Sequence, residues 1–126
     1  MTKRNKRILL VDDEESIVKI GNQILKRLGY EVESTTNPVE ALNLFRSKPD
    51  QFDLVITDLE MPKLTGDELV QEILKLRPHM PVIFSTGFSE RINRQKAKEI
   101  GVAGYIEKPW GKRELARLIL KMLDKK

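Results

Sequence analysis

Carboxylate side chains follow two short apolar segments of the chain. The segment from Ile8 to Val11 ends in Asp12 and Asp13. The segment from Leu54 to Thr57 ends in Asp58. Adjacent carboxylates repel each other, and Mg²⁺, which prefers oxygen ligands and usually retains several waters, would relieve that repulsion. If the two segments are neighbouring strands, three carboxylates converge on one crevice, where Asp58 is also a competent phosphoryl acceptor.

A hydroxyl and a cation follow two further apolar segments. Thr86 comes at the end of the segment from Pro81 to Ser85, and Lys108 comes directly after the segment from Gly104 to Glu107. A hydroxyl and an ammonium group beside a carboxylate can contact and neutralise the oxygens of a transferring phosphoryl group.

Each of these residues also has a simpler explanation when it is taken alone. Asp12 or Asp13 can cap a helix that begins near Glu15. Thr86 can form a turn, and Lys108 can be an ordinary surface charge. Only convergence of all the positions on one edge of a sheet favours the chemical interpretation.

Short apolar segments alternate with stretches of helical periodicity, and this alternation is typical of an α/β fold with a parallel sheet. We expect a single doubly wound (βα)5 sandwich, because parallel strands need crossover connections that place helices on both faces. Ligands bind at the carboxyl ends of the strands in such sheets. The predicted strands are Arg7 to Val11, Glu31 to Thr35, Leu54 to Thr57, Pro81 to Ser85 and Gly104 to Glu107.

Capping residues mark several of the predicted helices. Gly29 suits the end of the apolar stripe from Ile17 to Leu28, and Asn37 before Pro38 suits a helix start. Two further helices are predicted from the capping box of Thr65 with Glu68 and from the apolar face Leu115, Leu118, Ile119 and Met122. The stretch from Ile92 to Ile100 has only a thin apolar stripe, so we expect a weakly held helix there.

Composition limits the class of protein. The 126 residues, 40% of them hydrophobic, suit one domain over residues 1–126 with a basic leading segment at 1–6. No apolar run approaches the ~20 residues that span a bilayer, and the absence of cysteine suits the reducing cytoplasm. The net charge of +4 sits mainly near the two ends without a DNA- or RNA-binding motif, so we expect no direct nucleic-acid binding and no membrane insertion.

The five positions Asp12, Asp13, Asp58, Thr86 and Lys108 resemble, in order, those of the receiver domains of bacterial response regulators. The resemblance covers nearly the whole chain and extends to Met61-Pro62 after Asp58 and to the Lys108-Pro109 pair. It implies a chemotaxis-regulator-like domain of a two-component phosphorelay, with the flavodoxin-like strand order 2-1-3-4-5.

The resemblance also implies a role for each residue. Asp58 would accept the phosphoryl group. Mg²⁺ (or Mn²⁺) would contact Asp13, Asp58 and the backbone carbonyl of Glu60, with Asp12 helping through water. Lys108 would pair with Asp58 or its phosphate and precede a cis proline bond.

Signalling is expected to pass through contacts with another protein. The resemblance implies a sensor histidine kinase or a histidine phosphotransfer domain as donor, and a downstream protein target. Phosphate on Asp58 would draw Thr86 inward and vacate space for the ring of Tyr105, as a population shift. We expect a phosphoacceptor domain that assists its own phosphorylation and dephosphorylation, not an enzyme, and either a monomer or a phosphorylation-dependent dimer. Glu60, Phe88 and Trp110 differ from the residues of commoner receivers.

Two other functions are compatible with parts of this pattern. A metal-dependent phosphohydrolase also places a nucleophilic aspartate after a strand, but its haloacid-dehalogenase-like version has a second aspartate where this chain has Glu60. A phosphorylation-independent interaction module on the same fold would not need Mg²⁺.

Overall fold

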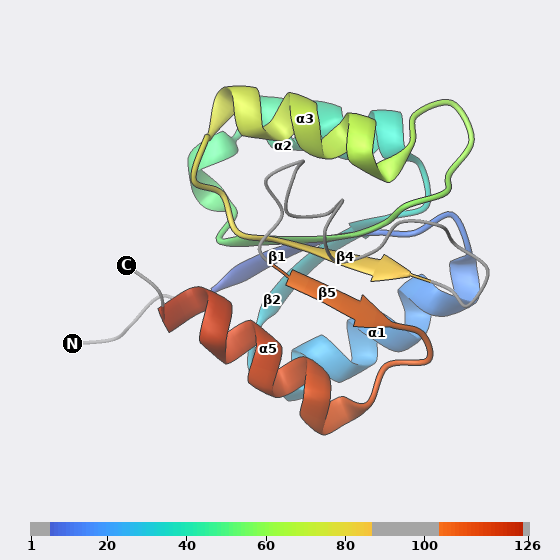
Figure 1. The fold of residues 1–126 in the computed structure, drawn as a ribbon, viewed down its shortest axis with the longest axis vertical. Coiled ribbons are helices and arrows are strands. Elements are labelled where there is room, and N and C mark those ends of the chain that lie inside the picture. The colour runs from blue at the N-terminus through green and yellow to red at the C-terminus, as the bar shows by residue number, and fades with distance from the viewer. Residues whose placement is uncertain (1–5, 87–103, 125–126) are drawn as a thin grey trace.

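The structure, a computed structural model, describes residues 6–86 and 104–124. A sheet lies between two layers of helices, with α2 and α3 on one face and α1 and α5 on the other (Figure 1). In chain order the elements are β1 Arg7–Val11, α1 Glu15–Arg27, β2 Glu31–Thr35, α2 Pro38–Ser47, a 3-10 turn Pro49–Gln51, β3 Leu54–Asp58, α3 Gly66–Leu76, β4 Val82–Thr86, β5 Gly104–Glu107 and α5 Lys112–Asp124.

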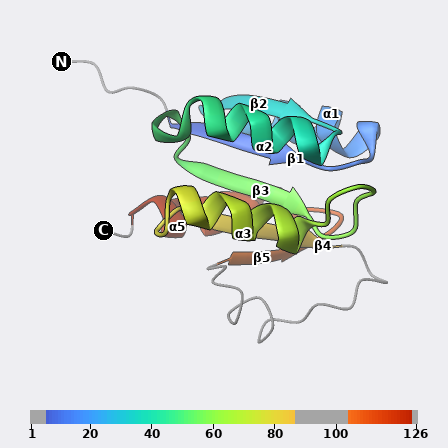
Figure 2. The same cartoon turned by 90° about the horizontal axis from the view of Figure 1, so that it is seen from above.

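The five strands are parallel and lie in the order β2-β1-β3-β4-β5, which confirms the predicted α/β fold and strand order. Figure 2 shows the strand arrows running in one direction, so that their carboxyl ends share one edge. β1 and β3 are neighbours, with Val11 opposite Thr57 in the register. The residues that follow these two strands are therefore brought together.

Two strands extend one residue further than the sequence indicates. Asp58 is the last residue of β3 and lies opposite Ser85, and Thr86 is the last residue of β4 and lies opposite Glu107. The sheet continues this far because the backbone carbonyl of Thr86 accepts a 2.8 Å hydrogen bond from the backbone N–H of Lys108. Two predicted site residues are thus part of the hydrogen-bonded sheet.

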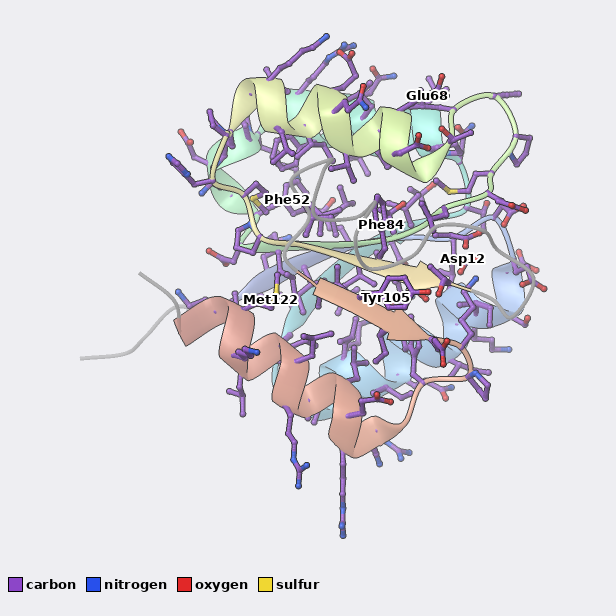
Figure 3. The ribbon with its side chains drawn as sticks, in the orientation of Figure 1. Asp12, Phe52, Glu68, Phe84, Tyr105 and Met122 are labelled. Carbon is purple, nitrogen blue, oxygen red and sulfur yellow. The ribbon has the colours of Figure 1, made fainter. Side chains whose placement is uncertain are left out.

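Alternating side chains of the strands fill two separate apolar cores. Leu9, Val55 and Phe84 pack with residues of α2 and α3, whereas Leu10, Ile56 and Ile83 pack with residues of α1 and α5. Figure 3 shows Phe52 and Phe84 on the α2 and α3 side of the sheet, and Met122 on the α5 side. Because helices cover both faces of the sheet, the strands are continuous apolar runs rather than alternations of apolar and polar residues. The alternation also determines toward which face each residue at a strand end points.

Helix ends follow the predicted capping chemistry. The Asn37 side chain accepts from the backbone N–H groups of Val39 and Glu40, and Thr65 with Glu68 forms the capping box that starts α3. Gly29 adopts φ 97°, a left-handed conformation that suits glycine after α1. Among the described residues, none of the helices is both long and apolar enough to cross a bilayer. The helix expected around Ile92 to Ile100 lies outside the described residues.

Gly66 brings the start of α3 against the backbone that carries Asp58. Its N–H donates a 2.7 Å hydrogen bond to the carbonyl of Leu59. A Cβ atom at this position would lie 2.0 Å from the carbonyl oxygen of Asp58 and 2.8 Å from the Cα of Leu59. Both obstacles are backbone atoms that cannot rotate away, so only glycine permits this approach.

We therefore expect Gly66→Ala to lower the free energy of unfolding by about 3 kcal/mol, because the added methyl group must displace the end of β3 or the start of α3. Urea denaturation measures this change. Gly111→Ala is the matched control, because a Cβ there meets its nearest atom at an ordinary 3.5 Å. If Gly66→Ala were no more destabilising than Gly111→Ala, the backbone contact would not constrain Asp58.

Candidate functional site

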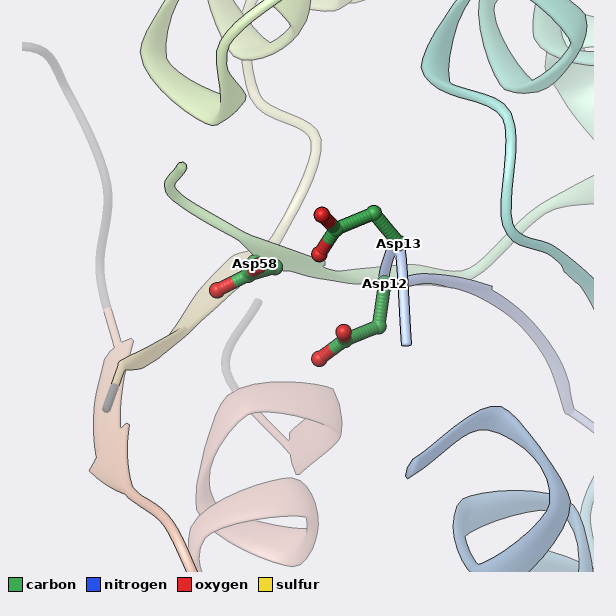
Figure 4. Close-up of side chains that lie close together, drawn as sticks. All are labelled: Asp12, Asp13 and Asp58. Atoms are coloured by element: carbon green, nitrogen blue, oxygen red, sulfur yellow. The ribbon is translucent and has the colours of Figure 1, made fainter. Parts of the chain in front are cut away.

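Three carboxylates meet at the carboxyl edge of the sheet. Asp12, Asp13 and Asp58 each offer an oxygen, and these oxygens lie within 4.8 Å of one another. Figure 4 shows Asp12 and Asp13 extending from the end of β1 toward the end of β3, where Asp58 lies. Asp12 is 1% exposed and Asp58 is 3% exposed, whereas Asp13 faces solvent. The predicted convergence of the three acids is confirmed.

Sheet hydrogen bonding positions the acidic pair after β1. The backbone N–H of Asp12 donates to the carbonyl of Thr35 in β2 at 3.3 Å, which continues the contact between the two strands by one residue. One carboxylate oxygen of Asp12, Oδ1, accepts a 2.9 Å hydrogen bond from the backbone N–H of Glu14. Asp12 thus stabilises the turn that leads into α1, but it does not cap the helix as its simpler interpretation held, because the N-cap residue is Glu14 and α1 has no side-chain cap hydrogen bond. The other carboxylate oxygen of Asp12 remains directed to the site.

Lys108 bridges two of the carboxylates. Its Nζ lies 2.7 Å from Oδ2 of Asp12 and 3.2 Å from Oδ1 of Asp58, and its side chain is only 13% exposed. The backbone of Lys108 is held to Thr86 of β4, and the peptide bond to Pro109 is cis, as the resemblance implied. Asp58 is fifty residues away in the sequence, so the sheet topology alone creates this ion pair.

The electrostatics of the site keep Lys108 charged. Burial lowers the pKa of the Lys108 ammonium, but hydrogen bonding and charge attraction from Asp12, supported by Asp58, outweigh it and leave the pKa raised above its usual value. Three carboxylates and one ammonium group formally leave two negative charges. A divalent cation would balance that excess.

The donor set fits a hard divalent cation. Carboxylate oxygens from three residues, one of them exposed, leave room for the waters that Mg²⁺ usually retains. Glu60 follows Asp58 by two residues in the loop that leads to α3, so its backbone carbonyl is close to the triad in the chain. The residues present therefore suit a metal centre.

Thr86 and Tyr105 share one face of the sheet. Thr86 is 1% exposed, and its hydroxyl makes no hydrogen bond to any residue in the described ranges. Tyr105 lies opposite Phe84, is half-buried, and packs against the same apolar core. A buried hydroxyl without a hydrogen bond in this part of the chain is poised to accept a new partner. Phe88 lies outside the described residues.

The predicted set of site residues does not include Ser85 and Trp110. The indole Nε1 of Trp110 donates a 2.8 Å hydrogen bond to Oγ of Ser85, which lies opposite Asp58 in the sheet. A polar Ser85 within an apolar strand is the sequence signal for such a contact. The partner could not be identified, because it lies twenty-five residues further along the chain.

Comparisons with known proteins agree with this geometry. A family model described as the response regulator receiver domain matches residues 8–120. A response regulator receiver domain protein from Clostridium thermocellum is 34% identical, with a TM-score of 0.89 and 94% of each chain covered. A CheY-like receiver domain protein from Methanospirillum hungatei is 36% identical, with a TM-score of 0.84 and coverage of 96% of this chain and 95% of that one.

Longer proteins also contain a similar segment. The probable transcriptional regulator ycf27 of Cyanidium caldarium is 38% identical over 121 residues, 96% of this chain and 47% of that protein. The sensor kinase CckA of Brucella abortus is 30% identical over 118 residues, 94% of this chain and 12% of that protein. The chain thus spans about half, or much less, of the length of these relatives.

A divalent cation should stabilise the fold through the triad. With Mg²⁺ as the probe, at a concentration 100 times its dissociation constant, we expect the free energy of unfolding to rise by about 2.7 kcal/mol. Asp13→Asn should remove most of this gain, because it deletes one charged ligand from the solvent-facing side of the site. Urea denaturation with and without Mg²⁺ measures the difference.

Asp50→Asn is the matched control for this measurement, since Asp50 is an exposed carboxylate in the turn before β3. Its variant should keep the full gain. Equal gains in all three proteins would place the cation elsewhere.

Proposed function

The chain belongs to the response regulator receiver domain family, and from that premise we propose that Asp58 is the residue that accepts the phosphoryl group. The observation that carries this assignment is the position of Asp58, whose Oδ1 lies 3.2 Å from the ammonium of Lys108 beside two further carboxylates. A receiver domain is a phosphoacceptor regulatory module rather than an enzyme in the usual sense.

In the proposed reaction, an oxygen of the Asp58 carboxylate attacks the phosphorus of a phosphohistidine on the donor protein. The phosphorus–nitrogen bond breaks as the phosphorus–oxygen bond forms, and the leaving imidazole keeps the electron pair and takes up a proton. The product is an acyl phosphate on Asp58. Lys108, already held at the carboxylate, lies where it can contact the arriving phosphoryl oxygens and stabilise their charge.

We propose Mg²⁺ (or Mn²⁺) as the ion, held by Asp12, Asp13, Asp58 and the backbone carbonyl of Glu60. The all-oxygen donor set and the excess of negative charge support this choice. When bound, such a cation neutralises charge on the transferring phosphoryl group. Asp13 faces solvent, so it offers the ligand on the side from which a donor would approach.

A kinase partner follows from the family, and we propose that it is a sensor histidine kinase or a histidine phosphotransfer domain. One similar segment lies in a protein named as a sensor kinase and another in one named as a probable transcriptional regulator. Similar segments therefore occur in two differently named kinds of protein. The downstream partner that we propose is accordingly described only as a protein target.

Asp58→Asn should abolish labelling of the domain by a phosphodonor such as acetyl phosphate in the presence of Mg²⁺, because an amide oxygen is a far weaker nucleophile than a carboxylate. Intact-protein mass spectrometry measures the added phosphoryl group, and Asp50→Asn should label like the unmodified chain. Undiminished labelling of Asp58→Asn would place the acceptor elsewhere in the protein.

We also propose that Thr86 and Tyr105 change their positions when Asp58 is phosphorylated. The buried Thr86 hydroxyl, without a hydrogen bond in the described part of the chain, would bond to a phosphoryl oxygen on Asp58, in the neighbouring strand. Tyr105 packs on the same face of the sheet, so a shift of Thr86 would change the space available to its ring.

Adding beryllofluoride, a phosphoryl mimic, with Mg²⁺ should therefore shift the ring signals of Tyr105 in an NMR spectrum. Thr86→Ala should reduce this shift at least severalfold, because it removes the hydroxyl that senses the mimic. Thr36→Ala, a change to an exposed residue beyond β2, should leave the shift intact. A full Tyr105 response in Thr86→Ala would refute the role of the hydroxyl.

A further inference from the structure

The side chain of Trp110 is hydrogen-bonded to the residue that lies beside Asp58 in the sheet. Its indole Nε1 donates a 2.8 Å hydrogen bond to Oγ of Ser85, and Ser85 lies opposite Asp58 in the sheet. Ser85 is only 1% exposed, so its hydroxyl is removed from bulk water. An indole N–H is a donor without acceptor capacity, which makes the direction of this bond unambiguous.

Small residues make room for the indole ring. A Cβ atom on Gly21 of α1 would lie 2.9 and 3.1 Å from two carbons of the Trp110 ring and 2.6 Å from a side-chain carbon of Leu10. Glycine in the middle of a helix costs about 0.5–1 kcal/mol relative to alanine, so it needs a packing reason, and the ring supplies one. Gly21, Ser85 and Trp110 therefore form one seat, which we call the indole seat.

The indole ring is packed on some sides and borders open space on another. Trp110, Pro109 and Lys108 line an open pocket of about 100 Å³ together with Ile17, Ile20 and Ile24 of α1. Because the pocket leaves space beside the indole, apolar contacts constrain its position only on some sides. The hydrogen bond to Ser85 adds a directional constraint to these packing contacts.

The segment that carries Lys108 is attached to two successive residues of β4. The backbone N–H of Lys108 donates to the carbonyl of Thr86, and the side chain of Trp110 donates to Ser85. From the first of these attachments, the Lys108 side chain extends to Asp12 and Asp58. An ammonium on a four-carbon chain has many conformations, so a fixed backbone narrows the volume it can reach.

We propose that Trp110 is a positioning residue for Lys108, acting through the indole seat to hold the ammonium at Asp58 for phosphoryl transfer. The expected effect of Trp110 on the rate of phosphoryl transfer rests on the proposed function. Its expected effect on the ion pair of Lys108 rests on geometry alone. Displacing a reacting group by about 1 Å can slow a reaction substantially, and the loss of one hydrogen bond permits such a displacement.

Two single variants remove opposite ends of the bond. Trp110→Phe retains an aromatic ring but deletes the N–H, and Ser85→Ala deletes the acceptor. We expect each to slow phosphoryl uptake from acetyl phosphate in Mg²⁺ by about fivefold, with no further slowing when both are combined, because the same bond is lost. Ser47→Ala is the control, because it breaks the 2.9 Å hydrogen bond from the Ser47 hydroxyl to the carbonyl of Leu44 at the exposed end of α2, and its rate should not change.

The same variants in a Lys108→Ala background separate positioning from general stability. If Trp110 acts through Lys108, Trp110→Phe and Ser85→Ala should leave the already reduced rate unchanged there. A fivefold loss that persists without Lys108, or no loss when Lys108 is present, would overturn the proposal.

A second readout does not depend on phosphorylation. In metal-free protein, the carboxyl carbon signals of Asp12 and Asp58 should move in Trp110→Phe in the direction that Lys108→Ala moves them, while Ser47→Ala leaves them in place. Unmoved signals in Trp110→Phe would refute the positioning role. If the unmodified chain takes up no phosphoryl group but the signals move as expected, the proposed function fails and the positioning of Lys108 stands.

Discussion

An ammonium group shared by two nearly buried carboxylates is the interaction on which the site depends. Lys108 sits 2.7 Å from Asp12 and 3.2 Å from Asp58, and the exposed fraction of its side chain is small. Removing such charges from water is unfavourable unless each has a close partner. The strand order supplies the partners, because β1 and β3 are adjacent and the chain returns to the same edge after β5. The fold thus gives each buried charge a close partner of opposite sign. The site in turn depends on the strand order that brings these partners together.

Much of the fold was predictable, because its signals are local. The five apolar segments, the Asn37 cap, the capping box at Thr65 and the glycine after α1 each depend on residues within a few positions of one another. The convergence of the acids also followed, since parallel strands place their carboxyl ends together. The predicted ends of β3 and β4 were each one residue short. Hydrogen bonds from neighbouring strands determine those ends, and these bonds have no local signature.

The contacts that the sequence did not reveal all join different elements of the fold. The bond between Trp110 and Ser85, the carbonyl of Thr35 that receives the Asp12 N–H, and the approach of Gly66 to Asp58 each link different elements. A single polar or glycine residue indicates that such a contact is needed, but it does not identify the partner. Family membership gives the class of chemistry, while these contacts explain how this chain holds its own residues in place.

The most direct measurement is a crystal structure of the chain grown with Mn²⁺, in which the metal is located by its anomalous scattering. The expected result is one peak bonded to carboxylate oxygens of Asp13 and Asp58 at about 2.1 Å, close to the distance at which Mg²⁺ binds oxygen ligands, with the Lys108 ammonium still beside Asp58. A peak away from these carboxylates, or Lys108 directed away from Asp58, would contradict the convergence of acids and cation on one site.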